Sequence, residues 1–101
     1  MADDLAKRWV LVLASLAGGP KHGYALIKDI EQFAGVTLGP GTLYGALARL
    51  EESGLVKALP AGRRRHPYEI TAAGAAALTE QLKRDELIAR VGLARVGVQA
   101  G

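Results

Sequence analysis

Apolar residues recur at helical spacing in three segments of the first half of the chain. Between residues 5 and 17 they are so dense that the predicted helix is apolar nearly all round, which is typical of a helix buried on more than one face. After the breaker Gly18-Gly19-Pro20, a second helix is predicted from about residue 22 to residue 34, with Gly35 as its C-terminal cap. Its expected apolar stripe is Tyr24, Ile27, Ile30 and Phe33 or Ala34, and its expected outward residues are Lys28, Asp29 and Glu31.

The third segment, GPGTLYGALARLEESGLV, opens on three residues that helices avoid in their interiors and then follows a clear helical pattern. Pro40 suits a first helical turn, because its missing N–H would have no partner there, and Gly39 can serve as the cap. The core face is expected to hold Leu43, Ala46, Leu47 and Leu50. The opposite face is expected to hold Gly41, Gly45, Ala48, Arg49 and Glu52, with Thr42 and Tyr44 on the flanks.

This outer face is almost bare of side chains near the start of the helix. A bare face lets the backbone come close to another molecule, and a helix N-terminus offers free N–H groups and a partial positive charge. The pattern therefore favours contact between the start of this helix and a phosphate group.

The spacing changes after Gly54, where short extended segments replace helices. Strands are predicted at residues 55–59 and 68–70, joined by a basic hairpin tip at residues 60–67. Thr71 can cap a last helix from about Ala72, and Gly92 and Gly97 are expected to weaken its end. The order of elements predicts a mainly α fold with a small β-hairpin (α+β): a winged helix-turn-helix in residues 1–71, followed by a C-terminal helix in residues 72–101.

Composition narrows the class of protein. Half of the 101 residues are hydrophobic, which suggests a surface buried against a partner, most simply a second copy. The chain has no cysteine, which excludes disulfides, thiol catalysis and cysteine-ligated zinc and fits a reducing cytoplasm. The apolar run at residues 9–17 is too short to span a bilayer, and two acids precede it where a signal peptide would be basic. We expect a cytoplasmic protein with no membrane partner.

The net charge of +3 is modest, but part of the positive charge is concentrated. Arg63, Arg64 and Arg65 are consecutive, with His66 next and Lys57 just upstream. A hairpin tip that is merely solvated and binds no partner could carry the same run of arginines. Beside a helix-turn-helix pattern, the cluster favours contact with nucleic-acid phosphate.

Catalysis and metal binding find little support. Ser15 and Ser53 have no plausible histidine partner, and no glycine loop has phosphate-loop spacing. The only histidines are His22 and His66, and two histidines without cysteine seldom form a metal site. We expect no enzymatic activity, no cofactor and no metal.

The segments LAGGPKHGYALIKDIE and LGPGTLYGALARLEESGLV resemble the two signature segments of PadR-like transcriptional regulators. The wing GRRRHPYEIT and the AAG that follows it extend the resemblance over roughly residues 11–82. The short length resembles the compact subfamily, which has a single C-terminal helix. The resemblance implies a winged-helix homodimer that binds a palindromic DNA operator, usually as a repressor that a small-molecule effector releases.

The resemblance also implies roles for individual residues. The implied DNA contacts are Tyr24, Pro40, Gly41, Thr42, Tyr44, Arg63, Arg64 and Arg65. Beside these, we expect Lys21, His22 and Arg49 as further candidates for DNA contact. In the family the last helix packs with the first in the dimer, which implies dimer or effector contacts by Leu5, Trp9, Leu13, Leu78, Leu82, Ile88 and Val91. Two positions depart from the family pattern, because Gly39 replaces the usual Ser or Thr and Gly45 the usual Pro. No aromatic residue follows Tyr68, so sensing by C-terminal tryptophans does not carry over.

Several interpretations remain open from the sequence. Arg49 can contact DNA or pair with Glu52, and Trp9 can lie in the core, at a dimer interface or against an effector. Besides a dimeric DNA-binding repressor, the chain can be a winged-helix protein-interaction module. It can also be a sensor of a small hydrophobic or aromatic molecule, with no direct DNA binding.

Overall fold

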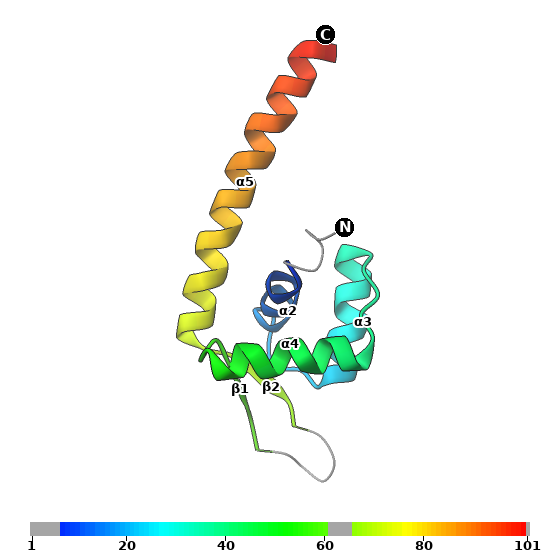
Figure 1. The fold of residues 1–101 in the computed structure, drawn as a ribbon, viewed down its shortest axis with the longest axis vertical. Helices are drawn as coiled ribbons and strands as arrows, with labels where there is room; N and C mark the ends of the chain where they lie inside the picture. Colours follow the sequence, from blue (N-terminus) through cyan, green and yellow to red (C-terminus); the bar gives the residue numbers. More distant parts are fainter. Residues whose placement is uncertain (1–6, 61–65, 101) are drawn as a thin grey trace.

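A computed structural model describes residues 7–60 and 66–100, with side chains described as far as residue 98 (Figure 1). Three helices gather at one end of the molecule: α2 (Arg8–Leu16), α3 (Gly23–Ala34) and α4 (Pro40–Glu52). A β-hairpin, β1 (Val56–Ala58) and β2 (Tyr68–Ile70), projects beyond α4, and α5 (Ala72–Ala100) leaves in the opposite direction. This arrangement confirms the mainly helical winged-helix fold with a small β-hairpin and one long C-terminal helix.

The core forms around α2, which packs against α3, α4, α5 and β2. Its apolar residues point in several directions, so each neighbouring element finds an apolar surface on it, as the sequence predicted. The face of α4 that the sequence assigned to the core is confirmed as well, with Ala46 half-buried beside the fully buried leucines. The buried core consists of Val10, Val12, Leu13, Leu16, Leu26, Ile30, Leu38, Leu43, Leu47, Leu50, Val56 and Leu78.

The core stripe of α3 differs from the predicted one. Leu26 and Ile30 are buried, Ile27 is half-buried, and Tyr24 and Phe33 are exposed at 62% and 51%. At about 100° per residue, Tyr24 lies roughly 160° around the helix from Leu26, so the two cannot share a buried face. The predicted apolar stripe was placed too far around the helix, because the prediction favoured the large aromatic residues Tyr24 and Phe33 over Leu26.

Asp29 was expected to face solvent, but it forms a polar contact at the α2–α3 interface. The Ser15 hydroxyl is buried and donates a hydrogen bond to Asp29 Oδ2 at 2.6 Å. A buried hydroxyl without a partner would lower the free energy of unfolding by about 1–3 kcal/mol. The hydrogen bond to the Asp29 carboxylate avoids this loss. The amphipathic pattern of α3 could not reveal this, because the partner lies on another helix.

The loop between α2 and α3 is tied to the hairpin. Lys21 and Tyr68 exchange two backbone hydrogen bonds, with N···O distances of 3.1 and 2.8 Å. The Lys21 ammonium also donates hydrogen bonds to the Ser15 carbonyl at 2.5 Å and to the Gly19 carbonyl at 3.3 Å. Its side chain thus satisfies carbonyls at the end of α2, where no helical N–H is available. The helix-turn-helix and the hairpin are therefore one hydrogen-bonded unit.

The hairpin strands are short, and their register is antiparallel, with Val56 opposite Ile70 and Ala58 opposite Tyr68. The first strand covers less than the predicted residues 55–59, whereas the second matches its prediction. Lys57 and Glu69 form an exposed ion pair at 3.4 Å, which contributes little to stability. The predicted basic tip at Arg63–Arg65 lies outside the described residues.

Helix α5 begins as predicted, with Thr71 as its cap. The Thr71 hydroxyl accepts a hydrogen bond from the Gly74 N–H at 3.0 Å and donates one to the Gly54 carbonyl at 2.7 Å. Gly74 is buried, and a Cβ at this position would overlap the carbonyl oxygen of Leu55. Only a glycine therefore lets the first turn of α5 pack against the main chain of Leu55, between α4 and β1.

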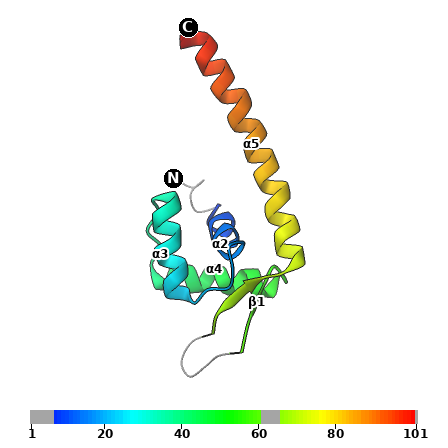
Figure 2. The same ribbon diagram turned by 180° about the vertical axis from the view of Figure 1, so that it is seen from behind.

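The far part of α5 continues through Gly92 and Gly97 to Ala100, which lies within the residues 72–101 predicted as the C-terminal helix. Each glycine costs only about 1 kcal/mol, which does not end a helix of this length. In two opposite views α5 runs clear of the other helices beyond its first turns (Figures 1 and 2). The exposed apolar side chains along it are Leu82, Leu87, Ile88, Val91, Leu93, Val96 and Val98.

The residues expected at a dimer or effector surface differ in how far they are exposed in the single chain. Leu13 and Leu78 are buried in the core of a single chain, where they pack against residues of the same chain. Both positions were chosen by helical spacing, which cannot tell an internal face from an intermolecular one. Leu82, Ile88 and Val91 are exposed, Trp9 is half-buried, and Leu5 lies outside the described residues.

In the described part of the chain, no helix has an apolar run long enough to cross a membrane.

Gly74→Ala is expected to lower the free energy of unfolding by about 1–3 kcal/mol, because a methyl group must displace main-chain atoms of Leu55. Gly92→Ala is the matched control in the same helix, where the new Cβ meets open space. This control should leave stability unchanged or raise it by up to about 1 kcal/mol. Urea denaturation of both variants measures the difference, and equal effects would contradict the close contact at Gly74.

Candidate nucleic-acid interface

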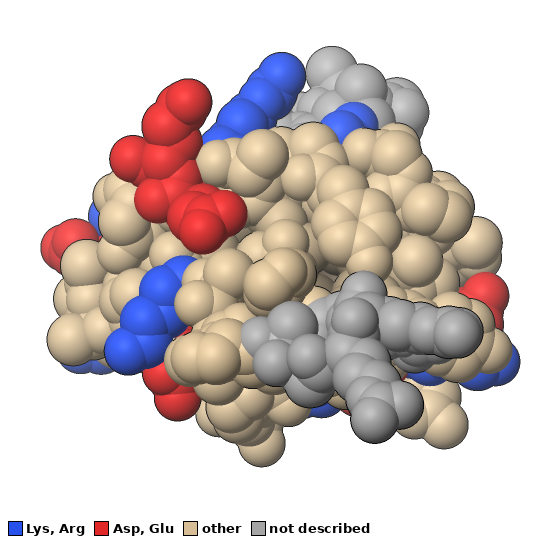
Figure 3. Space-filling model, turned by 90° about the horizontal axis from the view of Figure 1, so that it is seen from below, with Lys and Arg blue, Asp and Glu red and all other residues tan. Residues whose placement is uncertain are grey.

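The start of α3, the whole of α4 and the hairpin lie on one side of the molecule (Figure 1). The chain leaves α3 at Gly35, which adopts the left-handed conformation with φ 68°, and α4 begins five residues later at Pro40. This is a helix-turn-helix followed by a wing, the arrangement in which the second helix can enter a DNA groove. Figure 3 shows this side of the molecule face on.

Two tyrosines mark the meeting point of α3 and α4. The Tyr44 side chain is 49% exposed and lies against Gly23, the first residue of α3, where a Cβ would overlap its hydroxyl. Tyr24 is more exposed, and the Lys28 ammonium lies 5.8 Å from the centroid of its ring. Among the described residues, neither tyrosine hydroxyl has a hydrogen-bond partner. Both hydroxyls are thus available to an outside acceptor or donor.

A third tyrosine, Tyr68, borders this region from the wing. Burial raises the pKa of its hydroxyl above the ordinary value of 10.0, and the negative charge of Glu51 and then Tyr44 raise it further. The hydroxyl therefore stays protonated at neutral pH. Its backbone holds the wing to the loop before α3, so wing and helix-turn-helix keep a fixed spacing.

The outer face of α4 is as bare as the sequence predicted. A Cβ at Gly41 or Gly45 would meet nothing within 4 Å, so no contact inside the chain requires glycine there. Gly39 is the N-cap and makes no side-chain cap bond, and Pro40 occupies the first turn. The remaining N–H groups of that turn are therefore free of side-chain caps.

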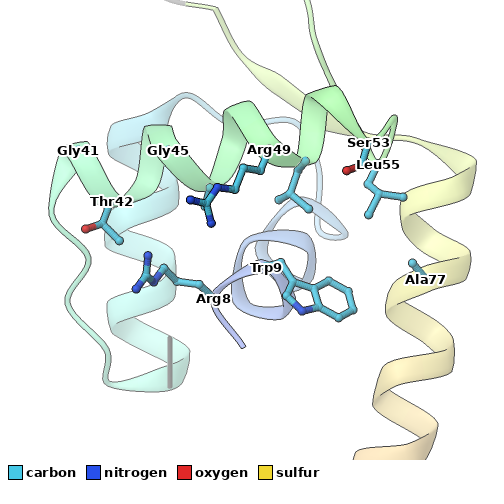
Figure 4. A pocket seen from close by; sticks show the side chains of 11 residues that line it. Arg8, Trp9, Gly41, Thr42, Gly45, Arg49, Ser53, Leu55 and Ala77 are labelled. Carbon is cyan, nitrogen blue, oxygen red and sulfur yellow. The ribbon is translucent and has the colours of Figure 1, made fainter. Parts of the chain in front are cut away.

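Arg49 and Thr42 lie on the other flank of α4. Figure 4 shows the Arg49 side chain on the side of α4 that faces α2, where Arg8 and Trp9 lie. Among the described residues Arg49 forms no ion pair, so the alternative pairing with Glu52 is not formed. The structure thus separates Arg49 from the tyrosines with which it was grouped. Arg8 was not singled out in the sequence, where nothing distinguishes it from a surface residue.

Charge on the described part of this side is sparse. In Figure 3 uncharged residues dominate, a few Lys and Arg side chains lie near the edges, and Asp and Glu side chains gather on one side. Glu51 and Glu52 are exposed at the C-terminal end of α4. His22 is exposed as the N-cap of α3, whereas the ammonium of Lys21 is held by main-chain carbonyls. The N-terminal half of α4 is therefore the half suited to an anion.

The structure offers no sign of a metal centre in residues 7–60 and 66–98, since no three His, Cys, Asp or Glu side chains converge there. The groups that converge are tyrosine hydroxyls, a capless helix start and open glycine positions. Such groups can donate hydrogen bonds to a partner and position it.

Comparisons with known proteins agree with this geometry. Residues 12–80 match the family described as "Transcriptional regulator PadR-like family". The transcriptional regulator Rv3488 of Mycobacterium tuberculosis is 39% identical over 82 residues, which cover 78% of this chain and 76% of that protein. A transcriptional regulator from Clostridium thermocellum has a similar structure, with a TM-score of 0.75 and 28% identity over 85% of this chain and 86% of that one.

A further relative is an uncharacterized 37.1 kDa protein of transposon Tn4556 from Streptomyces fradiae, which is 55% identical over 65 residues. These residues are 64% of this chain but 19% of that protein, so the chain spans only about a fifth of it. The winged-helix geometry and the match over residues 12–80 lead to one conclusion. The chain belongs to the PadR-like family of transcriptional regulators, in the compact form with a single long C-terminal helix, and this family is not one of enzymes.

Proposed function

We propose that this protein is a sequence-specific DNA-binding regulator that acts as a homodimeric repressor on a palindromic operator. The observation that carries the proposal is the uncapped, glycine-lined start of α4 beside two exposed tyrosines with free hydroxyls. It is a surface onto which a phosphate backbone fits closely. A regulator of this kind works where the DNA is, and we retain the cytoplasm as its proposed location.

Phosphate contacts are assigned to three groups of residues. The first turn of α4 contributes its N–H groups, with Pro40, Gly41 and Thr42 at the backbone and the Tyr44 hydroxyl beside them. The start of α3 contributes His22 and Tyr24, which are both exposed. The wing contributes Arg63, Arg64 and Arg65, which supply most of the charge. Lys21 and Arg49 contribute less, because their charged groups are directed elsewhere.

Sequence specificity has few side chains on which to rest. The outer face of α4 carries glycine and alanine where other recognition helices carry long polar residues. Base contacts by that face are therefore few, and the wing and the deformability of the operator supply much of the discrimination. We expect a preference for DNA shape that extends beyond the bases touched directly.

Dimerisation is assigned to α5, within the proposed division into residues 1–71 and 72–101. Its far part is a single unsupported helix with apolar side chains on more than one side, and Ile88 is 69% exposed. A second copy that packs its own α5 and α2 there would cover them, and single exposed helices of this kind are not stable alone. Two recognition helices then face one side of the DNA, about 34 Å apart.

Release by a small hydrophobic or aromatic effector completes the proposal. An effector acts only through different affinities for two arrangements of the dimer. Because wing and helix-turn-helix are hydrogen-bonded together, a change in the α5–α2 packing would move them as a unit. A protein-interaction module is the second candidate, since winged helices also bind proteins.

The two candidates differ in their dependence on salt. DNA binding through the arginine wing should weaken steeply between low and moderate salt, because each phosphate contact releases counterions. Arg64→Ala should lower affinity for all sequences by a similar factor and reduce the salt slope by about 1. Fluorescence anisotropy of a labelled random duplex at several salt concentrations measures both. Absence of binding at low salt would remove the DNA proposal and leave the protein-interaction candidate.

Gly45→Ala tests whether DNA comes close to the bare face of α4. The change should raise the free energy of unfolding by about 1 kcal/mol, because alanine favours helix and its Cβ meets open space. It should nevertheless lower DNA affinity about tenfold, which equals about 1.4 kcal/mol. Gly97→Ala is the matched control, with the same helix gain in α5 and unchanged DNA affinity. Wild-type affinity of Gly45→Ala would exclude close contact at this face.

Ile88→Asp tests the assignment of the dimer surface. The side chain is exposed in the single chain, so the fold should be retained while a charge is placed in the apolar interface. We expect sedimentation velocity to show a dimer for the parent protein and a monomer for this variant. Lys83→Asp introduces the same side chain on the polar side of α5 and should remain dimeric. A dimeric Ile88→Asp protein would move the interface elsewhere.

A further inference from the structure

Two glycines in the described part of the chain leave no room for a Cβ, and each faces a different kind of atom. At Gly74 a Cβ would overlap the main chain of Leu55. At Gly23 it would overlap the Tyr44 hydroxyl and lie 2.7 Å from Cζ of the same ring. A main chain gives way only with part of the fold, whereas the end of a side chain can turn aside. The two glycines therefore serve different purposes.

The backbone itself does not require glycine at position 23. Gly23 is the first residue of α3, and its φ does not lie in the left-handed region that favours glycine. Alanine would suit a helix better. The three atoms nearest to the position of a Cβ all belong to the Tyr44 side chain. The close approach of this ring is therefore the reason for a glycine.

The start of α3 is held in place by the loop before it. Lys21 exchanges two backbone hydrogen bonds with Tyr68, at 3.1 and 2.8 Å, and its ammonium binds carbonyls at the end of α2. The Tyr44 side chain, in contrast, is 49% exposed, and its hydroxyl has no partner among the described residues. A methyl group on residue 23 would therefore displace the ring and leave the main chain where it is.

The ring of Tyr44 joins the two helices of the helix-turn-helix. It belongs to α4, but its hydroxyl lies at the first turn of α3. His22, the N-cap of that turn, is exposed and makes no side-chain cap bond, so the first N–H groups of α3 are open to an outside acceptor. A phosphate at this point can accept hydrogen bonds from the turn and from the Tyr44 hydroxyl together. A ring turned away from Gly23 would lose this arrangement.

We infer that Gly23 is a positioning residue for DNA binding, because the absence of a side chain there holds the Tyr44 hydroxyl at the start of α3. This role rests on the proposed DNA function. Simple packing between α3 and α4 would make the same contact, but it would act on stability alone. Since Tyr44 is half-exposed, its ring buries little area for that purpose.

Fluorine NMR reports the position of the ring without DNA. The full-length protein contains three tyrosines, so labelling with fluorotyrosine gives three resonances, and Tyr44→Phe identifies the one of Tyr44. We expect Gly23→Ala to move this resonance toward that of free fluorotyrosine, and to move it further than the other two. Gly18→Ala is the matched control, because its new methyl group meets atoms at ordinary contact distances of 3.5 and 3.6 Å. It should leave the Tyr44 resonance unchanged.

DNA affinity is measured by fluorescence anisotropy with a labelled random duplex. Gly23→Ala and Tyr44→Phe should each lower affinity about tenfold, the expected loss for one hydrogen bond to a charged acceptor. In the Tyr44→Phe background, Gly23→Ala should lower affinity further by less than about twofold, because the hydroxyl that it displaces is already absent. Gly18→Ala should bind like the parent protein. In urea denaturation, all these variants should be about as stable as the parent.

Several outcomes would overturn the inference. An unchanged Tyr44 resonance in Gly23→Ala would show that the glycine does not hold the ring. An equal loss of affinity in the Tyr44→Phe background would show that Gly23 acts elsewhere, and a loss of stability like that of Gly74→Ala would mean that the main chain gives way. A shifted resonance with unchanged DNA affinity would overturn this inference alone and leave the DNA proposal standing. Failure of the parent protein itself to bind DNA at low salt would instead remove the proposed function, and this inference with it.

Discussion

The burial of α2 is the constraint on which the other elements depend. It is apolar on several faces, and α3, α4, α5 and β2 each cover part of it. Without that shared surface the three short helices would be unstable, because isolated helices of this length do not form in water. The position of α4, and with it the whole proposed interface, is therefore set by residues that never reach the surface. Substitutions at the buried positions of α2, such as Val12 and Leu16, should therefore affect function only through stability.

Much of this arrangement could be predicted from the sequence. The start of α4 at Pro40, the cap at Thr71 and the second strand were correct, because each depends on local preferences of the chain. The bare face of α4 followed from helical spacing alone. What could not be predicted depended on contacts between distant residues. The hydrogen bond from Ser15 to Asp29, and the burial of Leu78 inside one chain, become visible only when the helices are packed.

The candidate site was predictable to a similar extent. The residues at the start of α3 and α4 were identified by their resemblance to family segments, and the structure places Tyr24 and Tyr44 near the α3–α4 junction. Arg49 shared their segment but lies on the other flank of the helix. A linear motif groups residues by order, whereas a helix distributes them around a circle. Arg49 and Arg8 line the same pocket from two different helices, so no single motif contains both.

The length of α5 has a mechanical consequence. Its 29 residues rise about 43 Å at 1.5 Å per residue, while the described contacts with the rest of the chain lie in its first half, from Gly74 against Leu55 to the ion pair of Lys7 with Asp85. A tilt of about 5° at the Gly74 contact moves the far end by roughly 4 Å over this rise. The helix is thus a lever with its fulcrum beside the end of α4. Small changes in packing at the fulcrum therefore become larger displacements at the free end of α5.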